Sequence, residues 1–239
     1  MAEQVNINNV VNPRAMHIDG SSHVVGWLGL TSGNPWLNTQ PVFRSTTGGP
    51  SAAIPSYGYY DVAASPPSPE YASVELSARV PTPDTVYTFL GYASSPVVAD
   101  FNVGIAWYDT VENALEHDGF LGADNGVTQS ISPNTWTSGR AVGAAPTGAG
   151  AMLLQVRLIT APGALVGKRV KFSGLLVAET VGVNAPYSGE YFDGGTAASG
   201  ITSYEWEGVA HDSNSVQTIQ LVAATTPPSV GMLTIIGKA

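Results

Sequence analysis

The sequence contains no cysteine, so it has neither a disulfide framework nor thiol chemistry. Charged residues are scarce as well, at 11% of 239 residues, and 18 acidic residues outnumber nine lysines and arginines. The net charge of −9 argues against nucleic acid as a partner, because phosphate binding needs a basic surface. The charge does not exclude a neutral glycan.

Long hydrophobic runs are also missing. No apolar stretch approaches the length that spans a membrane, so no membrane partner is predicted. Residues 1–9 lack the basic and apolar regions of a secretory signal. A protein with this sequence that acts outside a cell would leave it by another route.

Recognisable catalytic motifs are absent. There is no G-x-S-x-G elbow and no H-E-x-x-H pair. The four histidines have no metal-ligand spacing: His17, His23, His117 and His211. We therefore predict no enzymatic activity, no catalytic residue, no cofactor and no metal site. Asp109, Glu116 and Asp118 offer hard oxygen ligands to calcium, but a solvated acidic edge is the favoured interpretation.

Glycine (27) and proline (17) are abundant, and hydrophobic residues make up 44% of the chain, as is typical of a loop-rich all-β protein. Apolar residues alternate with a period of two over 72–80, 101–108, 152–159 and 169–178, which indicates strands. Residues 85–92 are expected to return antiparallel to the first of these. The pattern predicts an antiparallel β-sandwich.

The strand over 169–178 has apolar residues on both faces. Val170, Phe172, Leu176 and Ala178 are expected to share one face, with a bulge or close approach at Gly174. The strand over 152–159 is apolar on both faces in part. We therefore expect the C-terminal segment or a neighbouring subunit to cover one outer face.

Aromatic residues interrupt an otherwise loop-like stretch from 29 to 69. Aromatic rings on long loops stack on the apolar faces of sugars, and they also anchor such loops to a core. Both interpretations stay open from the sequence. The candidate glycan-binding residues are those predicted to lie in loops: Trp36, Tyr57, Tyr59, Tyr60 and Trp136. Trp27, Trp107 and Phe172 are expected to fill the core instead.

The stretch from Tyr187 to Ser215 packs aromatic residues around two glycine-rich breaks. Tyr204 and Trp206 alternate with glutamates, so a half-exposed strand in an aromatic hairpin is predicted. Asp193 is expected to cap a turn through its own backbone.

This stretch also carries a resemblance. The order Y-x-G-x-Y-F-D-G, Y-x-W-x-G and S-x-S resembles the C-terminal signature of minor tail proteins of phages that infect actinobacteria. The resemblance extends over most of residues 5–215. The signature residues are Tyr187, Tyr191, Phe192, Asp193, Gly194, Tyr204, Trp206 and Gly208.

The resemblance implies a jelly-roll sandwich similar to carbohydrate-binding modules over residues 1–180, with a C-terminal signature segment and extension over 181–239. It implies a virion location, other virion proteins as partners, a homo-oligomer, and contact with host cell-wall glycan. Many relatives have an acidic residue just after the position of Phe172. Here Ser173 follows, which argues against a structural calcium ion.

Three functions remain open from the sequence. The first is a phage tail component with glycan binding, the second is a capsid decoration protein built on the same module, and the third is the sugar-binding module of a secreted glycoside hydrolase. Residues 216–239 are either a docking arm for another chain or a last strand of the same domain.

Overall fold

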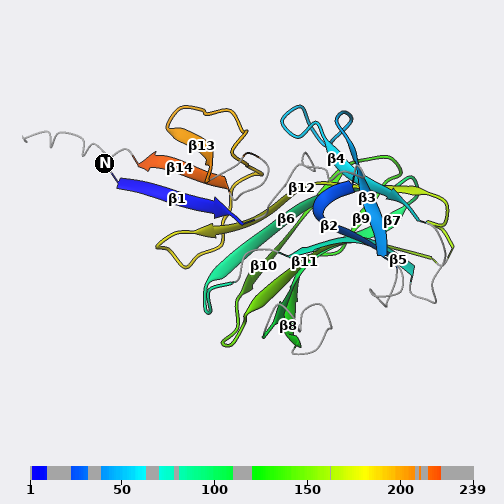
Figure 1. The fold of residues 1–239 in the computed structure, drawn as a ribbon, viewed down its shortest axis with the longest axis horizontal. Coiled ribbons are helices and arrows are strands. Elements are labelled where there is room, and N and C mark those ends of the chain that lie inside the picture. The colour runs from blue at the N-terminus through cyan, green and yellow to red at the C-terminus, as the bar shows by residue number, and fades with distance from the viewer. Residues whose placement is uncertain are drawn as a thin grey trace, which may run out of the picture.

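The protein is an all-β sandwich, and all pairings between its described strands are antiparallel (Figure 1). The structure, a computed structural model, describes residues 2–9, 23–31, 39–62, 70–77, 81–109, 120–161, 163–207, 210 and 215–221. Its strands are β1 (Ala2–Asn8), β2 (His23–Thr31), β3 (Thr39–Ser45), β4 (Tyr57–Asp61), β5 (Glu70–Ser77), β6 (Val86–Ser94), β7 (Ala99–Tyr108), β8 (Phe120–Asn125), β9 (Gln129–Ile131), β10 (Thr137–Ala144), β11 (Ala151–Thr160), β12 (Arg169–Thr180), β13 (Thr202–Trp206) and β14 (Ser215–Leu221).

Two layers enclose the core. In one layer β12 lies between β6 and β4, and β10 flanks β6. In the other, β11 lies between β5 and β7, which in turn pairs with β8 and β9. β3 and β2 join the layers along one side. The predicted jelly-roll sandwich is thereby confirmed.

Alternation along the strands places the core residues. Phe101, Val103 and Trp107 of β7 are buried between the layers, as predicted. Leu154 of β11 and Phe172 of β12 meet them from neighbouring strands. Burial of such side chains contributes about 1.5–3 kcal/mol each, so this core is the main source of stability.

The prediction that residues 85–92 return antiparallel to 72–80 is wrong. β5 pairs with β2 and β11, whereas β6 pairs with β10 and β12 in the opposite layer. The backbone NH of Thr82 donates to the hydroxyl of Tyr87 at 2.9 Å. The Tyr87 ring packs against Trp107 of the other layer, with centroids 6.0 Å apart. The chain therefore crosses the sandwich here, which lets Tyr87 fill the core.

The predicted face of β12 is also partly wrong. The register of β12 against β6 shifts between Ser173 and Leu176, and Gly174 has a φ of 58°. The bulge predicted at Gly174 is thus confirmed, but it reverses the alternation after it. Leu175 and Val177 consequently face the main core, while Leu176 faces outward.

The segment after β12 covers this outer face. Tyr187 and Phe192 are buried against Leu90, Leu176 and Ala178, and the Tyr187 and Phe192 rings meet edge to face at 5.6 Å. The expectation that the C-terminal segment covers an outer face is confirmed for β12.

Main-chain contacts tie this segment to the sandwich. The Arg140 guanidinium of β10 donates to the carbonyl oxygens of Tyr187 and Gly189 at 2.5 and 2.6 Å. Burial raises the pKa of Tyr187 to about 12, and its hydroxyl donates to the Glu190 carbonyl at 2.8 Å. The segment is therefore an integral layer on β6 and β12.

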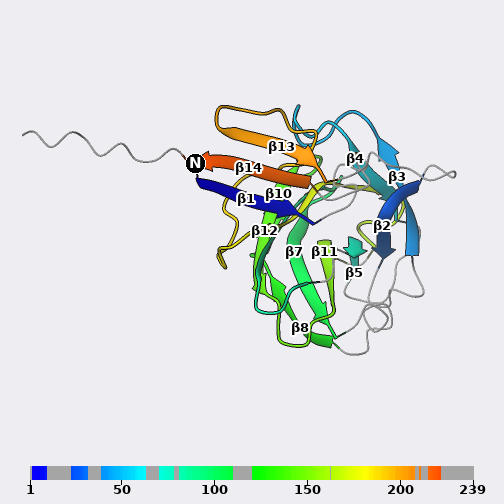
Figure 2. The same cartoon turned by 60° about the vertical axis from the view of Figure 1, so that its left-hand side comes forward.

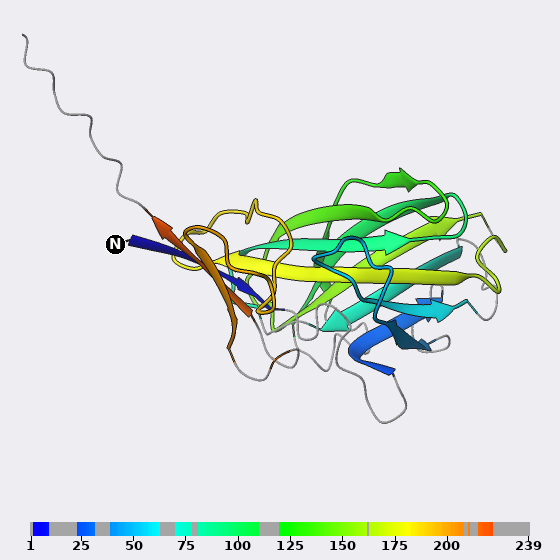
Figure 3. The same ribbon diagram turned by 90° about the horizontal axis from the view of Figure 1, so that it is seen from above.

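The two ends of the chain meet. β1 pairs with β14 along its whole length, from Ala2 opposite Leu221 to Asn8 opposite Ser215. β14 pairs in turn with β13, so the predicted strand at Tyr204 and Trp206 is confirmed, but its partner strand begins only at Ser215, the end of the stretch expected to contain the whole hairpin. Figures 2 and 3 show β1, β13 and β14 together at one end of the sandwich. Residues 215–221 are thus a strand of this chain. The division into two domains after residue 180 stays a prediction, and residues 222–239 lie outside the described part.

No helix occurs among the described residues, so none of them forms a membrane-spanning helix.

Candidate functional site

β3, β4 and the start of β12 lie side by side and present one outer surface. Phe43 of β3 is opposite Tyr59 of β4, and Tyr59 is opposite Lys171 of β12. Tyr60 and Val170, which alternate with this row, are buried in the main core. Since side chains alternate across a strand, Phe43, Tyr59 and Lys171 stand together on the face away from the core.

Four rings gather on this surface. Tyr59 lies 6.0 Å from both Phe43 and Tyr57, and Tyr57 lies 5.6 Å from Trp136, all measured between ring centroids. Each of the four side chains is partly exposed. We call Phe43, Tyr57, Tyr59 and Trp136 the outer aromatic cluster.

The geometry of the cluster is fixed by its surroundings. Trp136 precedes β10, and its indole NH donates to the carbonyl oxygen of Gly48 at 3.0 Å. Tyr57 and Tyr59 are held by the backbone pairing of β4 with β3 and β12. Rings on paired strands lose little freedom when a ligand binds, so the cluster is organised in advance.

Two cations border the rings. The Arg169 guanidinium carbon lies 4.2 Å from the centre of Tyr59, and the Lys171 ammonium nitrogen lies 5.4 Å from the centre of Tyr57. Both fall within the range of cation–π attraction.

Arg169 is already paired. Its Nε and Nη2 donate to the two carboxylate oxygens of Asp61 at 2.8 and 2.9 Å. This hydrogen bonding lowers the pKa of Asp61 and raises the pKa of Arg169. The two side chains are 57% and 50% exposed, so the pair contributes at most about 1 kcal/mol to stability. Its main effect is to cancel one positive charge at the cluster.

The structure brings together three of the five candidate glycan-binding residues, namely Tyr57, Tyr59 and Trp136. Their glycan binding stays a prediction. Tyr57 and Tyr59 lie on a strand and not in the loop that the sequence predicted. Trp36 lies outside the described residues.

Tyr60, the fourth described candidate, does not belong to this surface, contrary to the prediction. It is 1% exposed, its ring stacks on Phe172 with centroids 6.0 Å apart, and its hydroxyl donates to the Ser73 carbonyl at 2.9 Å. Its ring therefore has no face to offer a ligand. The reason is the pleat of β4, which turns Tyr60 inward where Tyr59 points outward.

Phe43, Arg169 and Lys171 were missed by sequence reasoning. Phe43 lies in the aromatic-bearing stretch from 29 to 69 but is not among the five candidates. The alternation of Arg169 and Lys171 with Val170 and Phe172 shows that the two cations share an outer face. No local signal connects that face to β4, because the pairing joins residues more than 100 positions apart.

The described residues that resemble the phage signature make contacts within the fold. A Cβ on Gly194 would lie 2.5 Å from Cγ of Trp206, so the backbone passes directly against the indole. Asp193 caps its turn as predicted, because its Oδ1 accepts from the backbone NH of Gly195 at 2.9 Å. Its Oδ2 accepts from the Tyr191 hydroxyl at 2.8 Å. Gly208 lies outside the described residues.

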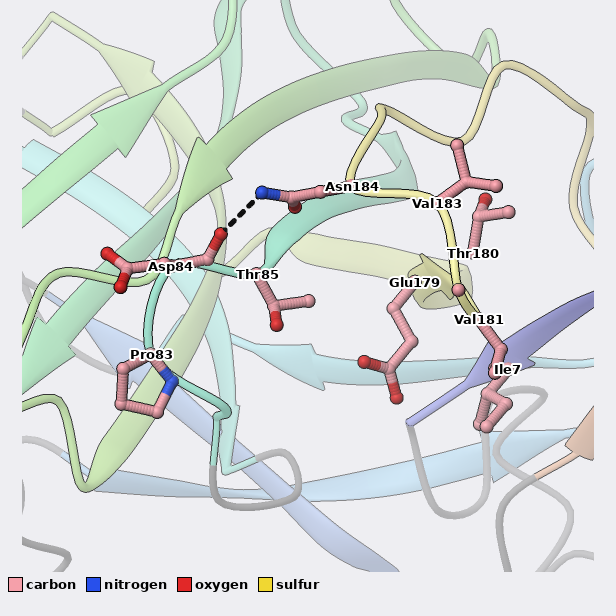
Figure 4. Close-up of a pocket in the computed structure, with 10 residues that line it drawn as sticks. Ile7, Pro83, Asp84, Thr85, Glu179, Thr180, Val181, Val183 and Asn184 are labelled. Carbon is pink, nitrogen blue, oxygen red and sulfur yellow. Dashed lines mark hydrogen bonds between the residues drawn. The ribbon is translucent and has the colours of Figure 1, made fainter.

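A cleft of about 540 Å³ lies where the end of β12 approaches β1 and the start of β6 (Figure 4). It contains two carboxylates, those of Asp84 and Glu179. Asn184 holds the backbone at the start of β6 in place: its side-chain amide donates to the Asp84 carbonyl oxygen and accepts from the Val86 NH, both at 2.7 Å. Figure 4 shows the Asp84 carboxylate directed away from Glu179, which makes the two a poor pair for acid–base chemistry.

Metal ligands do not gather in the described part of the chain, where no group of three or more histidine or acidic side chains is placed to hold an ion. Glu116 and Asp118, named above as possible calcium ligands, lie outside that part.

No protein-family model matches the chain, and no curated protein matches it. Similar solved structures include the enzymatically active domain of tailspike protein 4 of bacteriophage CBA120, at 12% identity and a TM-score of 0.48 over 72% of this chain and 21% of that one. The C-terminal family 22 carbohydrate-binding module of Clostridium thermocellum Xyn10B matches at 13% identity and a TM-score of 0.45, over 69% and 98%.

A xylan-binding domain of the same module family matches at 14% identity and a TM-score of 0.45, over 67% of this chain and 90% of that one. The chain thus spans about a fifth of the tailspike chain that it matches, at 21%. With TM-scores below 0.5, these likenesses carry no argument about what this chain binds.

Proposed function

We propose that the protein is a non-catalytic, glycan-binding component of a phage tail, and that it binds host cell-wall glycan through the outer aromatic cluster. The supporting observation is the gathering of three partly exposed rings on one surface, where the Tyr57 ring centroid lies 6.0 Å from that of Tyr59 and 5.6 Å from that of Trp136. The C–H faces of a sugar ring stack on such rings, and neighbouring polar groups orient the hydroxyls.

The size of the cluster suits several sugar units. Centroids 5.6–6.0 Å apart, from Phe43 through Tyr59 and Tyr57 to Trp136, form a chain of rings that is longer than one pyranose. A polysaccharide would therefore contact more rings than a monosaccharide. The affinity of one copy is expected to be modest, and many copies on a virion would raise it by avidity.

The placement in a phage tail rests on the sequence signature alone. Capsid decoration by the same module is the alternative, and in that case sugar binding would be incidental. A homo-oligomer is expected for a virion component, by analogy with symmetric assemblies.

Replacing both Tyr59 and Trp136 by alanine should reduce binding to actinobacterial cell walls at least about ten-fold, since each stacked ring contributes about 0.5–1.5 kcal/mol beyond its buried area. Binding is measured by pull-down and biolayer interferometry with the protein displayed multivalently. Phe120→Ala is the matched control, because Phe120 is 56% exposed and lies on β8, away from the cluster. Equal binding by wild type and double variant would refute the site. No binding by wild-type protein would refute the function.

The location is tested separately. Gold-labelled antibody against the protein should mark the tail tip of phage particles in electron micrographs. Label spread over the capsid would favour the decoration role, and unlabelled particles would contradict a virion location altogether.

A further inference from the structure

Lys171 is one of the two cations that border the outer aromatic cluster, and its surroundings indicate what kind of glycan fits. We propose that the glycan bound by the outer aromatic cluster carries an anionic group, a carboxylate or a phosphate, and that Lys171 binds this group. The inference rests on the proposed glycan binding and adds the chemical class of the ligand.

Lys171 is the cation that remains available. Among the described residues it has no carboxylate within ion-pair distance, whereas Arg169 is bound side-on by Asp61. The ammonium lies 5.4 Å from the centre of Tyr57, near the outer limit of cation–π attraction, so the ring does not occupy its hydrogen-bond donors.

The position of Lys171 matches a stacked sugar. It stands in the same cross-strand row as Tyr59, and its side chain reaches Tyr57. A pyranose lying on either ring has its exocyclic groups at the ring edge, a few ångströms from the stacked face. A carboxylate or phosphate there would meet the ammonium directly, and charge-assisted hydrogen bonds of this kind are about twice as strong as neutral ones.

The scarcity of basic residues makes their position informative. The chain has nine lysines and arginines against 18 acidic residues, yet two of the nine border the same group of rings, and Asp61 neutralises only one of the two. Binding of a neutral ligand would require neither of these positive charges. The alternative is that both cations merely support neighbouring tyrosines, and in that case their loss would weaken binding to neutral and acidic glycans equally.

Paired probes separate these cases. The first pair is polygalacturonate and the same polymer after chemical reduction of its carboxyl groups, and the second is a phosphate-substituted mannan before and after phosphatase treatment. An array of microbial polysaccharides is tested beside both pairs. Each polysaccharide is present in its native form and in a form whose carboxyl or phosphate groups have been reduced or removed. Wild-type protein should bind the acidic member of a pair at least about ten-fold more tightly, and the pair that shows the difference identifies carboxylate or phosphate.

Variants then assign the preference to its residues. Lys171→Met should lower binding of the acidic member to that of its neutral partner, and Lys171→Arg should retain the preference. Asp61→Asn should strengthen binding of the acidic member, because it removes a negative charge and releases Arg169. Thermal melting of each variant checks the fold.

The outcomes distinguish the two proposals. Equal binding of acidic and neutral members by wild type, or an equal loss on both with Lys171→Met, would overturn the anionic ligand and leave glycan binding in place. Absence of binding to every polysaccharide would overturn glycan binding, and the anionic ligand with it.

Discussion

Phe192→Ala should lower the free energy of unfolding by about 3–5 kcal/mol, the usual loss for a buried phenylalanine. Phe192 is 1% exposed and packs with Tyr187 on Leu90 and Leu176, which lie on the outer face of the sandwich. Truncation leaves a cavity between this face and the segment that covers it. Urea unfolding followed by tryptophan fluorescence and circular dichroism measures the loss.

Phe120→Ala is again the matched control, since Phe120 is 56% exposed and meets Tyr108 edge to face at 5.6 Å, so its truncation should cost about 1–2 kcal/mol, less than that of Phe192. Hydrogen exchange over residues 187–206 gives a second measurement. The exchange should quicken there in Phe192→Ala before it quickens in β7 or β11. A loss no larger than that of Phe120→Ala would show that the segment adds little to the stability of the sandwich.

The sequence predicted what depends on alternation within one strand. Phe101, Val103 and Trp107 follow period two without interruption, and the structure buries all three in the core. The same holds for Met152 and Leu154 of β11. In these strands the inward face is a local property, because each side chain points opposite to the one before it.

Pairing between distant segments was not predictable. β5 and β6 are consecutive in the chain but lie in different layers. β3 and β4 lie in the stretch from 29 to 69, which is predicted to be a loop because it is rich in proline and glycine. β4 is short, and its sequence alone does not show which residues face the core. In the structure Gly58 and Tyr60 are buried, whereas Tyr57 and Tyr59 are partly exposed, because β4 pairs with β12.

The candidate site illustrates the same limit. Phe43, Tyr59 and Lys171 form one row although they are far apart in the sequence, and only the strand register connects them. Aromatic composition alone selected Tyr59 and Tyr60 together, whereas the pleat turns Tyr59 to the outer surface and Tyr60 into the core. Arg169 and Lys171 lie beside these rings only because β12 pairs with β4.

The bulge at Gly174 turns Leu175 toward the core and Leu176 toward the segment that contains Tyr187 and Phe192. Two separate features of the structure favour glycine at this position. Its φ is 58°, a conformation that costs other residues about 1–2 kcal/mol. A Cβ at this position would also lie 2.8 Å from Cδ2 of Tyr92 and 3.1 Å from Cδ1 of Ile54. Gly174→Ala should therefore lower the free energy of unfolding by about 2–4 kcal/mol, which urea unfolding measures.

Gly200 provides a control that separates the two reasons. It has the same φ of 58°, but a Cβ there would meet nothing within 4 Å. Gly200→Ala should cost about 1–2 kcal/mol, the part that belongs to the backbone alone. Equal losses in the two variants would remove the steric part of the argument. Since the bulge turns Leu176 toward Phe192, Gly174→Ala should also speed hydrogen exchange over residues 187–206, whereas Gly200→Ala should change exchange only near its own turn.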